Sequence, residues 1–376
     1  MYRLTPYDSN KAEQFYQKFA PAIWRRVDYW LNHGAKRVVL EGRDTKSGRK
    51  ADIVLNVRVE VGSATDTFLR AVQKPIYLHW FMTFTPDHLD CVVDKILNMF
   101  PPKRRVLASK KLDCTIYRVF YKGQTDIDHF HTIVYDVFVD CVFDGEENGS
   151  PVFDRQWFCR KVGVVICPYC GAEDITTGAV TRQAGVTYVK PDVDHFLPKS
   201  RYPYLAMSYT NLIPCSVTCN RRRKHTFDPI ASLTPLQYKL MLPYLFDEQR
   251  LRFYYDIDNG NYLSEDAYQV KIDYYGDANL EEGYSRQMGI DGLYATKGYM
   301  LKDLYVSMSG VSDDYVRLMA TMGAQVKVSD IHYKPSIVTF IGHPDTEEAS
   351  GKYPYHKFYK DMASQMIDDG NCGWCW

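Results

Sequence analysis

The segment Asp192-Val193-Asp194-His195-Phe196-Leu197-Pro198-Lys199 is the most informative part of this 376-residue chain, and it is followed by Asn211-Leu212-Ile213-Pro214-Cys215 and Cys219-Asn220-Arg221-Arg222-Arg223-Lys224. Neighbouring residues on a strand point to opposite faces, so Asp194 and His195 serve one site only where the chain bends. Pro198 is suited to such a bend. A helix is expected to begin beyond Cys219, and residues four apart on it share a face. The spacing predicts two strands and a helix around one ion.

The residue types in these segments match the needs of metal-assisted phosphodiester hydrolysis. A divalent cation requires hard oxygen ligands and open positions for phosphate oxygens and water. Asp194 offers a carboxylate and Asn220 a carbonyl oxygen. His195 is adjacent to Asp194, and an imidazole with an ordinary pKa of about 6.5 is a suitable general base near neutral pH. We therefore expect Asp194 and Asn220 to bind Mg²⁺ or Mn²⁺ and His195 to accept a proton.

Four cysteines occur as two pairs around this segment. Cys167 and Cys170 form a CxxC pair, and Cys215 and Cys219 form a CxxxC pair. The N-terminal residues lack the apolar core of a secretory signal, so we expect a cytoplasmic protein with few disulfides. The paired spacing then favours metal binding, although buried thiols are the simpler alternative.

The segments in this order resemble the HNH family of His-Me finger (ββα-metal) endonucleases, in the branch with paired cysteines and zinc. The resemblance covers residues 165–227, about a sixth of the chain. It implies that His195 is the general base, that Asp194 and Asn220 bind the catalytic ion, and that Asn211 hydrogen-bonds backbone and holds the loop that carries His195. It also implies a structural zinc bound by the four cysteines, which are Cys167, Cys170, Cys215 and Cys219.

The second cysteine pair departs from the family pattern. The family more often has CxxC here, but Ser216 occupies the expected first position and Cys215 lies one residue earlier. A CxxxC pair can still close on zinc. Cys159 and His225 are alternative fourth ligands if Cys215 does not reach the ion.

Basic residues are concentrated in the same region. Between Phe196 and Thr226 there is no Asp or Glu, and six cations are present: Lys199, Arg201, Arg221, Arg222, Arg223 and Lys224. The whole chain has 46 basic and 46 acidic residues, so any affinity for a polyanion must arise from local clusters. These six side chains are candidates for binding nucleic acid, with a solvated helix face as the alternative.

The composition is that of a globular protein, with 45% hydrophobic and 24% charged residues. We expect an α+β protein in three parts. Residues 1–155 form a mixed α/β region that binds substrate or a partner, residues 156–230 form the ββα-metal module, and residues 231–376 form a hairpin followed by helices. Two finer expectations are a second helix that starts at Pro21 and a buried strand over Tyr77–Phe84.

Two other motifs are weaker candidates for a functional site. Asp128-His129-Phe130-His131 also contains an Asp-His pair, but it lies in an apolar helical stretch without a following cysteine pair, and we expect it to be structural. Cys372 and Cys375 form a terminal CxxC, to which we assign no role.

These observations lead to a metal-dependent HNH endonuclease, with DNA as the expected substrate by family analogy. A role in bacterial restriction or anti-phage defence, within a complex with a protein partner, is a further hypothesis. No apolar run is long enough to suggest a membrane partner. The alternatives are a non-catalytic zinc module that binds nucleic acid or acts as a scaffold, and an RNA-cleaving toxin on the same core.

Overall fold

The described part of the chain combines helices with small antiparallel sheets, as expected for the α+β class. The structure is a computed structural model that describes residues 4, 7–33, 35–43, 50–99, 126–139, 153–175, 179–182, 185–188, 191–225, 227–232, 241–258, 260–309, 349 and 351–369. Each sheet in these ranges has two strands. None of the helices in these ranges is long and apolar enough to cross a bilayer. The terminal CxxC pair lies outside the described residues.

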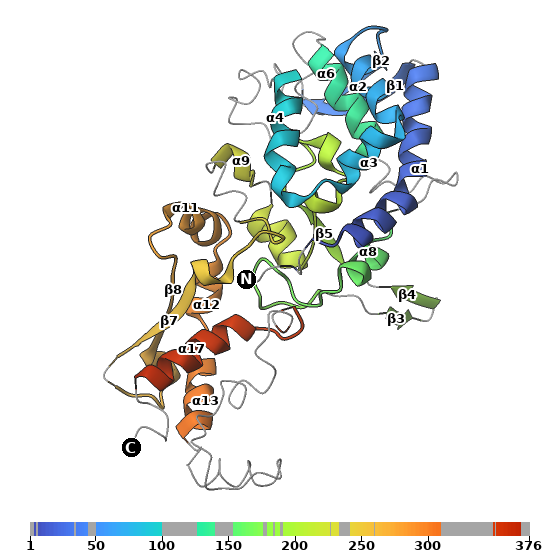
Figure 1. Cartoon of the computed structure of the whole chain (residues 1–376). Coiled ribbons are helices and arrows are strands. Elements are labelled where there is room, and N and C mark those ends of the chain that lie inside the picture. The colour runs from blue at the N-terminus through green and yellow to red at the C-terminus, as the bar shows by residue number, and fades with distance from the viewer. Residues whose placement is uncertain are drawn as a thin grey trace.

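Helices dominate the N-terminal part, which forms one end of the molecule (Figure 1). A hairpin of β1 and β2 follows the first helix, with Val38 opposite Leu55 in its register. The elements are α1 (Ser9–His33), β1 (Ala35–Arg43), β2 (Lys50–Arg58), α2 (Ala64–Gln73), α3 (Pro75–Thr83), α4 (Leu89–Met99) and α6 (Asp126–Val134), which continues as a π-type turn over Tyr135–Val139.

The prediction of a separate helix from Pro21 is wrong, because α1 continues through this residue as one helix. A proline inside a helix costs about 3 kcal/mol. One face of α1 is buried along its whole length, through Phe15, Phe19, Ile23 and Val27. Each such side chain contributes about 1.5–3 kcal/mol on burial, so the buried face outweighs the proline.

The prediction of a strand over Tyr77–Phe84 is also wrong, because most of this segment belongs to α3. Leu78, Phe81 and Met82 are buried, at the spacing of one helix face, whereas Ile76 and Tyr77 are exposed. The outward residues are apolar too, which conceals the helical period in the sequence. A short apolar run does not distinguish a strand from a helix.

The central segment contains α8 and two short antiparallel strand pairs, and it lies between the two ends of the molecule (Figure 1). Asp154 caps α8 by accepting a hydrogen bond from the Trp157 backbone, and Gly163 ends it in the left-handed conformation. The elements are α8 (Arg155–Val162), β3 (Ala179–Arg182), β4 (Gly185–Tyr188), β5 (Asp192–His195), β6 (Leu212–Cys215), the π-type helix η7 (Cys219–Lys224) and α9 (Pro229–Ser232).

The C-terminal part forms the opposite end of the molecule, where α17 packs on a hairpin (Figure 1). The hairpin expected within residues 231–376 is present as an antiparallel pair of strands. Its elements are β7 (Arg252–Ile257), β8 (Tyr268–Asp273), α11 (Ala278–Leu280) with a π-type turn over Glu281–Gln287, α12 (Ile290–Ala295), α13 (Gly298–Ser309) and α17 (His356–Asp368).

Hydrogen bonds tie the central segment to both ends. Thr210 donates its hydroxyl proton to the carbonyl oxygen of Phe84, at 2.6 Å, on the N-terminal side. On the C-terminal side, the Tyr294 hydroxyl donates to the carbonyl oxygen of Cys170, at 2.7 Å. The buried side chains of all three parts form one continuous hydrophobic core. The central segment is therefore hydrogen-bonded to both ends of the molecule.

Candidate functional site

The strands β5 and β6 form an antiparallel pair, and η7 packs against β5. Asp192 lies opposite Cys215 and His195 lies opposite Leu212 in the register of the pair. All residues of both strands are buried. Two strands followed by a helix are thus present in the order that the sequence indicates, and β5 carries both Asp194 and His195.

Asp194 is buried, and two side chains, Tyr169 and Lys224, bond to its carboxylate. The Tyr169 hydroxyl donates to its Oδ2 at 2.7 Å. The Lys224 ammonium lies 3.1 Å from Oδ2 and 3.3 Å from Oδ1. Burial raises the pKa of Asp194, and the nearby charge of Lys224 and these hydrogen bonds oppose the rise. The carboxylate is therefore retained inside the protein by a cation and a hydroxyl that favour its charged form.

The hydrogen bond of His195 defines the tautomer of its neutral ring. Nε2 lies 3.1 Å from the carbonyl oxygen of Ala206. A carbonyl oxygen only accepts, so Nε2 carries the proton and Nδ1 carries the lone pair of the neutral imidazole. Burial holds the pKa of His195 well below its usual range, and the positive charge of Lys199 adds to the effect. The shift favours the uncharged ring and makes it a weaker base than the ordinary imidazole that the sequence suggests.

Asn211 is completely buried and bonds only to backbone groups in the described structure. Its Oδ1 accepts from the Leu197 amide at 2.7 Å, and its Nδ2 donates to the carbonyl oxygens of Leu197 and Leu205, each at 3.1 Å. Leu197 follows β5 by two residues, and Leu205 immediately precedes Ala206. Asn211 therefore fixes both the chain that leaves His195 and the segment that supplies its hydrogen-bond acceptor.

Asn220 contacts Asp192 across the face that β5 presents to η7. Its Nδ2 donates to Asp192 Oδ2 at 3.3 Å. This bond orients the side-chain amide of Asn220. Its amino group faces Asp192, so its carbonyl oxygen lies on the side of the amide away from that hydrogen bond. Asp192 is itself buried and bound by Arg221 through two hydrogen bonds of 2.9 and 3.0 Å. Within the described residues, the hydrogen bond of the Asn220 side chain thus joins it to Asp192 and not to Asp194, the other predicted ligand of the catalytic ion.

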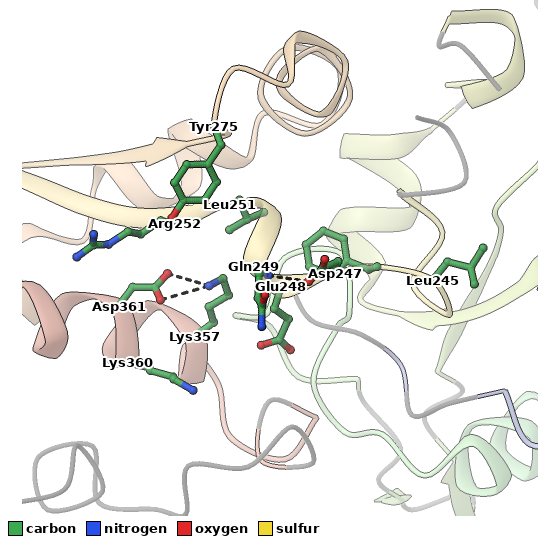
Figure 2. A pocket seen from close by; sticks show the side chains of 11 residues that line it. Leu245, Asp247, Glu248, Gln249, Leu251, Arg252, Tyr275, Lys357, Lys360 and Asp361 are labelled. Atoms are coloured by element: carbon green, nitrogen blue, oxygen red, sulfur yellow. Dashed lines mark hydrogen bonds and ion pairs between the residues drawn. The ribbon is translucent and has the colours of Figure 1, made fainter. Parts of the chain in front are cut away.

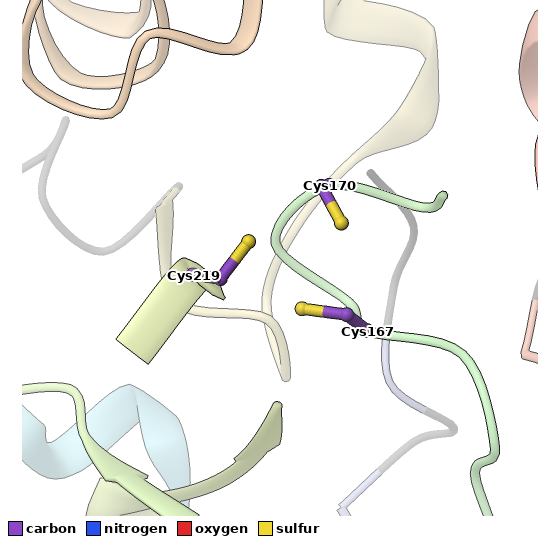
Figure 3. A group of neighbouring side chains, drawn as sticks. All are labelled: Cys167, Cys170 and Cys219. Carbon is purple, nitrogen blue, oxygen red and sulfur yellow. The ribbon is translucent and has the colours of Figure 1, made fainter. Parts of the chain in front are cut away.

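Three of the four predicted thiols converge on one point (Figure 3). The sulfur atoms of Cys167, Cys170 and Cys219 lie within 4.8 Å of one another, and all three residues are buried. Zn–S bonds of about 2.3 Å in a tetrahedron place the sulfurs about 3.8 Å apart, so the group is wide enough to enclose zinc. Cys167 and Cys170 lie on one tight loop, and Cys219 begins η7. These residues could therefore hold a metal ion.

Cys215 is not part of this thiol group within the described structure. It lies on β6, and burial raises its pKa well above the ordinary value, with the negative charge of Asp194 as the next cause. Ser216, one residue later, hydrogen-bonds Cys167 instead and accepts from the Cys219 amide at 3.2 Å. The serine thus lies where the family pattern has a cysteine, and Cys159 and His225, the other candidates, are not in the group either.

The thiols influence one another strongly. Burial raises the pKa of Cys167, but hydrogen bonds from Cys170, Cys219 and Ser216 reverse this and place its pKa well below the usual range. The hydrogen bond with Cys167 raises the pKa of Cys170 to about 12. Negative charge on Cys167 therefore opposes ionisation of the neighbouring thiols, and a bound cation would relieve this repulsion.

The predicted basic cluster is largely engaged with the protein itself. Arg201 pairs with Asp228 at 2.6 Å, and Arg221 pairs with Asp192. Arg223 donates to the carbonyl oxygens of Met288 and Gly289. Lys224 is buried against Asp194, and Lys199 lies 6.0 Å from the ring centre of Tyr135. Arg222 is exposed.

Sequence reasoning missed two residues of this site, Asp192 and Tyr169. Asp192 could have been found, because it lies two positions before Asp194 and alternate residues of a strand share a face. Tyr169 lies inside the CxxC pair, where the intervening residues carry no family signal. Its contact with Asp194 joins residues 25 positions apart and arises only in the folded chain.

A cavity of about 520 Å³ lies in the C-terminal part, between the start of β7 and α17 (Figure 2). Its wall includes Arg252, Tyr275, and an ion pair between Lys357 and Asp361 at 3.0 Å. None of its lining residues belongs to β5, β6, η7 or the cysteine loop. The cavity is therefore separate from the candidate site.

No protein-family model, curated protein or solved structure matches this chain.

Proposed function

We propose that β5, β6 and η7 form the active site of a metal-dependent endonuclease of the HNH type. The supporting observation is the placement of His195, which is buried at the end of β5, follows Asp194 in the sequence and bonds through Nε2 to the Ala206 carbonyl. In the neutral tautomer that this bond selects, Nδ1 carries the lone pair that a general base needs.

Each side chain then has one task in the hydrolysis of a phosphodiester. His195 accepts a proton from the attacking water at Nδ1. Asn211 holds the loops on both sides of the imidazole through its three backbone hydrogen bonds. Asp194 and Asn220 would bind Mg²⁺ or Mn²⁺, which stabilises negative charge on the phosphoryl oxygens when bound.

The cysteine group has a structural task in this proposal. Cys167, Cys170 and Cys219 would hold zinc and connect the loop that carries Tyr169 to the start of η7. The strands β5 and β6 have only four residues each, so a small unit gains much of its stability from such a cross-link.

DNA is the proposed substrate by analogy with the family, and a restriction or anti-phage role with a protein partner extends the same analogy. Arg221 and Arg222 are both exposed, but Arg221 pairs with Asp192, so phosphate contacts would begin most naturally at Arg222.

A non-catalytic zinc module is the second candidate, and the pairing of cations within the site favours it. Lys224 and Arg221 satisfy Asp194 and Asp192 inside the protein, as they would in a purely structural core. In that reading the carboxylates and the imidazole stabilise the fold and no substrate reaches them.

Cleavage of nucleic acid distinguishes these candidates. Full-length protein is incubated with supercoiled plasmid and with structured RNA, in Mg²⁺, Mn²⁺ or a chelator. We expect plasmid nicking with either metal and none with the chelator. Replacing His195 with alanine should slow cleavage by about 10²–10⁴-fold, the usual contribution of a general base.

Cys91→Ser is a matched control for contaminating nuclease, since it is purified identically and alters an exposed side chain of α4, outside the proposed site. It should retain metal-dependent cleavage. Equal cleavage by the wild type and the His195→Ala variant would contradict the proposal and leave the non-catalytic module. Cleavage of RNA alone would assign the site to the RNA-cleaving alternative.

A further inference from the structure

Tyr169 lies between the two cysteines of the CxxC pair and reaches out of their loop to β5. Its side chain is 1% exposed, and its hydroxyl donates to Asp194 Oδ2 at 2.7 Å. The charge of Asp194 and burial both raise the pKa of Tyr169, with burial as the larger cause, so the hydroxyl keeps its proton and remains a donor.

The loop that carries Tyr169 is closed by its own backbone. The Gly171 amide donates to the carbonyl oxygen of Cys167 at 2.7 Å, and the Cys167 amide donates to that of Glu173 at 2.8 Å. Gly171 has a φ of 67°, a left-handed conformation that glycine adopts without strain. The phenol ring therefore leaves a rigid base, and its hydroxyl has a defined position relative to β5.

Asp194 is held on two sides by groups from different parts of the chain. Lys224 from η7 lies near both carboxylate oxygens and also donates to the carbonyl oxygen of His195 at 2.9 Å. Tyr169 bonds to Oδ2 alone. Lys224 contacts both carboxylate oxygens and so does not distinguish them, whereas the phenol bonds to one oxygen and favours one rotation of the carboxylate.

We propose that Tyr169 is a positioning residue that orients the Asp194 carboxylate for the divalent cation. The inference rests on the proposed function, because it requires Asp194 to be a metal ligand. Hydrogen-bonding partners of metal ligands typically change metal affinity by about 10–100-fold when they are removed. Tyr169 therefore acts on the affinity for the ion, and the water-activating imidazole of His195 is unaffected by it.

The test uses the variant Tyr169→Phe, which lacks the hydroxyl group. Its affinity for Mn²⁺ is measured in two ways. Free Mn²⁺ is titrated by electron paramagnetic resonance, and the Mn²⁺ concentration for half-maximal plasmid cleavage is determined. We expect both constants to rise at least about tenfold. The cleavage rate at saturating Mn²⁺ should stay within about twofold, because the chemical step is performed by His195.

Tyr204→Phe is the matched control. Tyr204 is as buried as Tyr169, and its hydroxyl has no hydrogen-bond partner in the described structure. This variant should bind Mn²⁺ as the wild type does, and both variants should keep the zinc content of the wild type.

Several results would overturn the inference. These are an unchanged Mn²⁺ affinity in Tyr169→Phe, an equal loss in Tyr204→Phe, a loss of rate without a change in affinity, or a wild type that does not bind Mn²⁺. A different result would contradict the proposed function but not this inference. If the wild type binds Mn²⁺ but does not cleave, and Tyr169→Phe weakens that binding, the positioning role stands while the nuclease proposal falls.

Discussion

Replacing Lys224 with methionine should lower the free energy of unfolding by about 3 kcal/mol. Lys224 is 2% exposed, and its ammonium bonds to the buried carboxylate of Asp194 and to the carbonyl oxygen of His195. The variant leaves a buried carboxylate without its cation, and an uncompensated charge costs more than the ion pair contributes. Urea-induced unfolding followed by tryptophan fluorescence measures the change.

Two further variants test the cause of this loss. Arg222→Met makes the same kind of change at an exposed position of η7 and should alter the unfolding free energy by less than about 0.5 kcal/mol. The double variant Lys224→Met/Asp194→Asn removes both charges, so it should be more stable than Lys224→Met alone. A single Lys224→Met variant as stable as the wild type would show that the ion pair is absent.

The purified protein should contain about one zinc ion per chain, and Cys219→Ser should lose it. Structural zinc in small domains binds with about 10–16 kcal/mol of free energy near pH 7, most of which appears as folding stability. The loss should therefore lower the midpoint of thermal unfolding by more than any other single change here. Elemental analysis by mass spectrometry and thermal unfolding with and without a chelator provide the measurement.

Variants of two other cysteines serve as controls for this experiment. Cys91 is exposed and outside the thiol group, so Cys91→Ser should retain zinc and wild-type stability. Cys215→Ala should also retain zinc, because its sulfur does not join the other three. Zinc-free wild-type protein would refute a structural metal site. Loss of zinc in Cys215→Ala would restore the four-cysteine site that the sequence indicates.

The order of elements around the site could be predicted from the sequence because it depends on local patterns. Short runs such as Asp192–His195 and Leu212–Cys215 specify strands, and Pro198 marks the bend after the first. The meeting of Cys167 and Cys170 with Cys219 follows from paired spacing. The absence of Cys215 from this group could not be predicted, because it depends on how β6 packs in the folded chain.

The partners of charged residues could not be predicted for a related reason. The basic segment from Phe196 to Thr226 contains no acid, but Asp192, Asp194 and Asp228 lie just outside it and bind three of its cations. Such pairs join residues 27–30 positions apart, and they form only in the folded chain. A charge count along the sequence therefore overestimates the positive surface.

Divalent-cation binding at Asp194 tests the central proposal most directly. Mn²⁺ is titrated by electron paramagnetic resonance into zinc-loaded wild type and into Asp194→Asn, which keeps the size of the side chain and an oxygen acceptor for Tyr169. Circular dichroism and zinc content establish that both proteins are folded. We predict one Mn²⁺ site in the wild type and at least a tenfold weaker site in the variant. The same Mn²⁺ affinity in both proteins, or no binding to the wild type, would contradict a catalytic metal centre on β5.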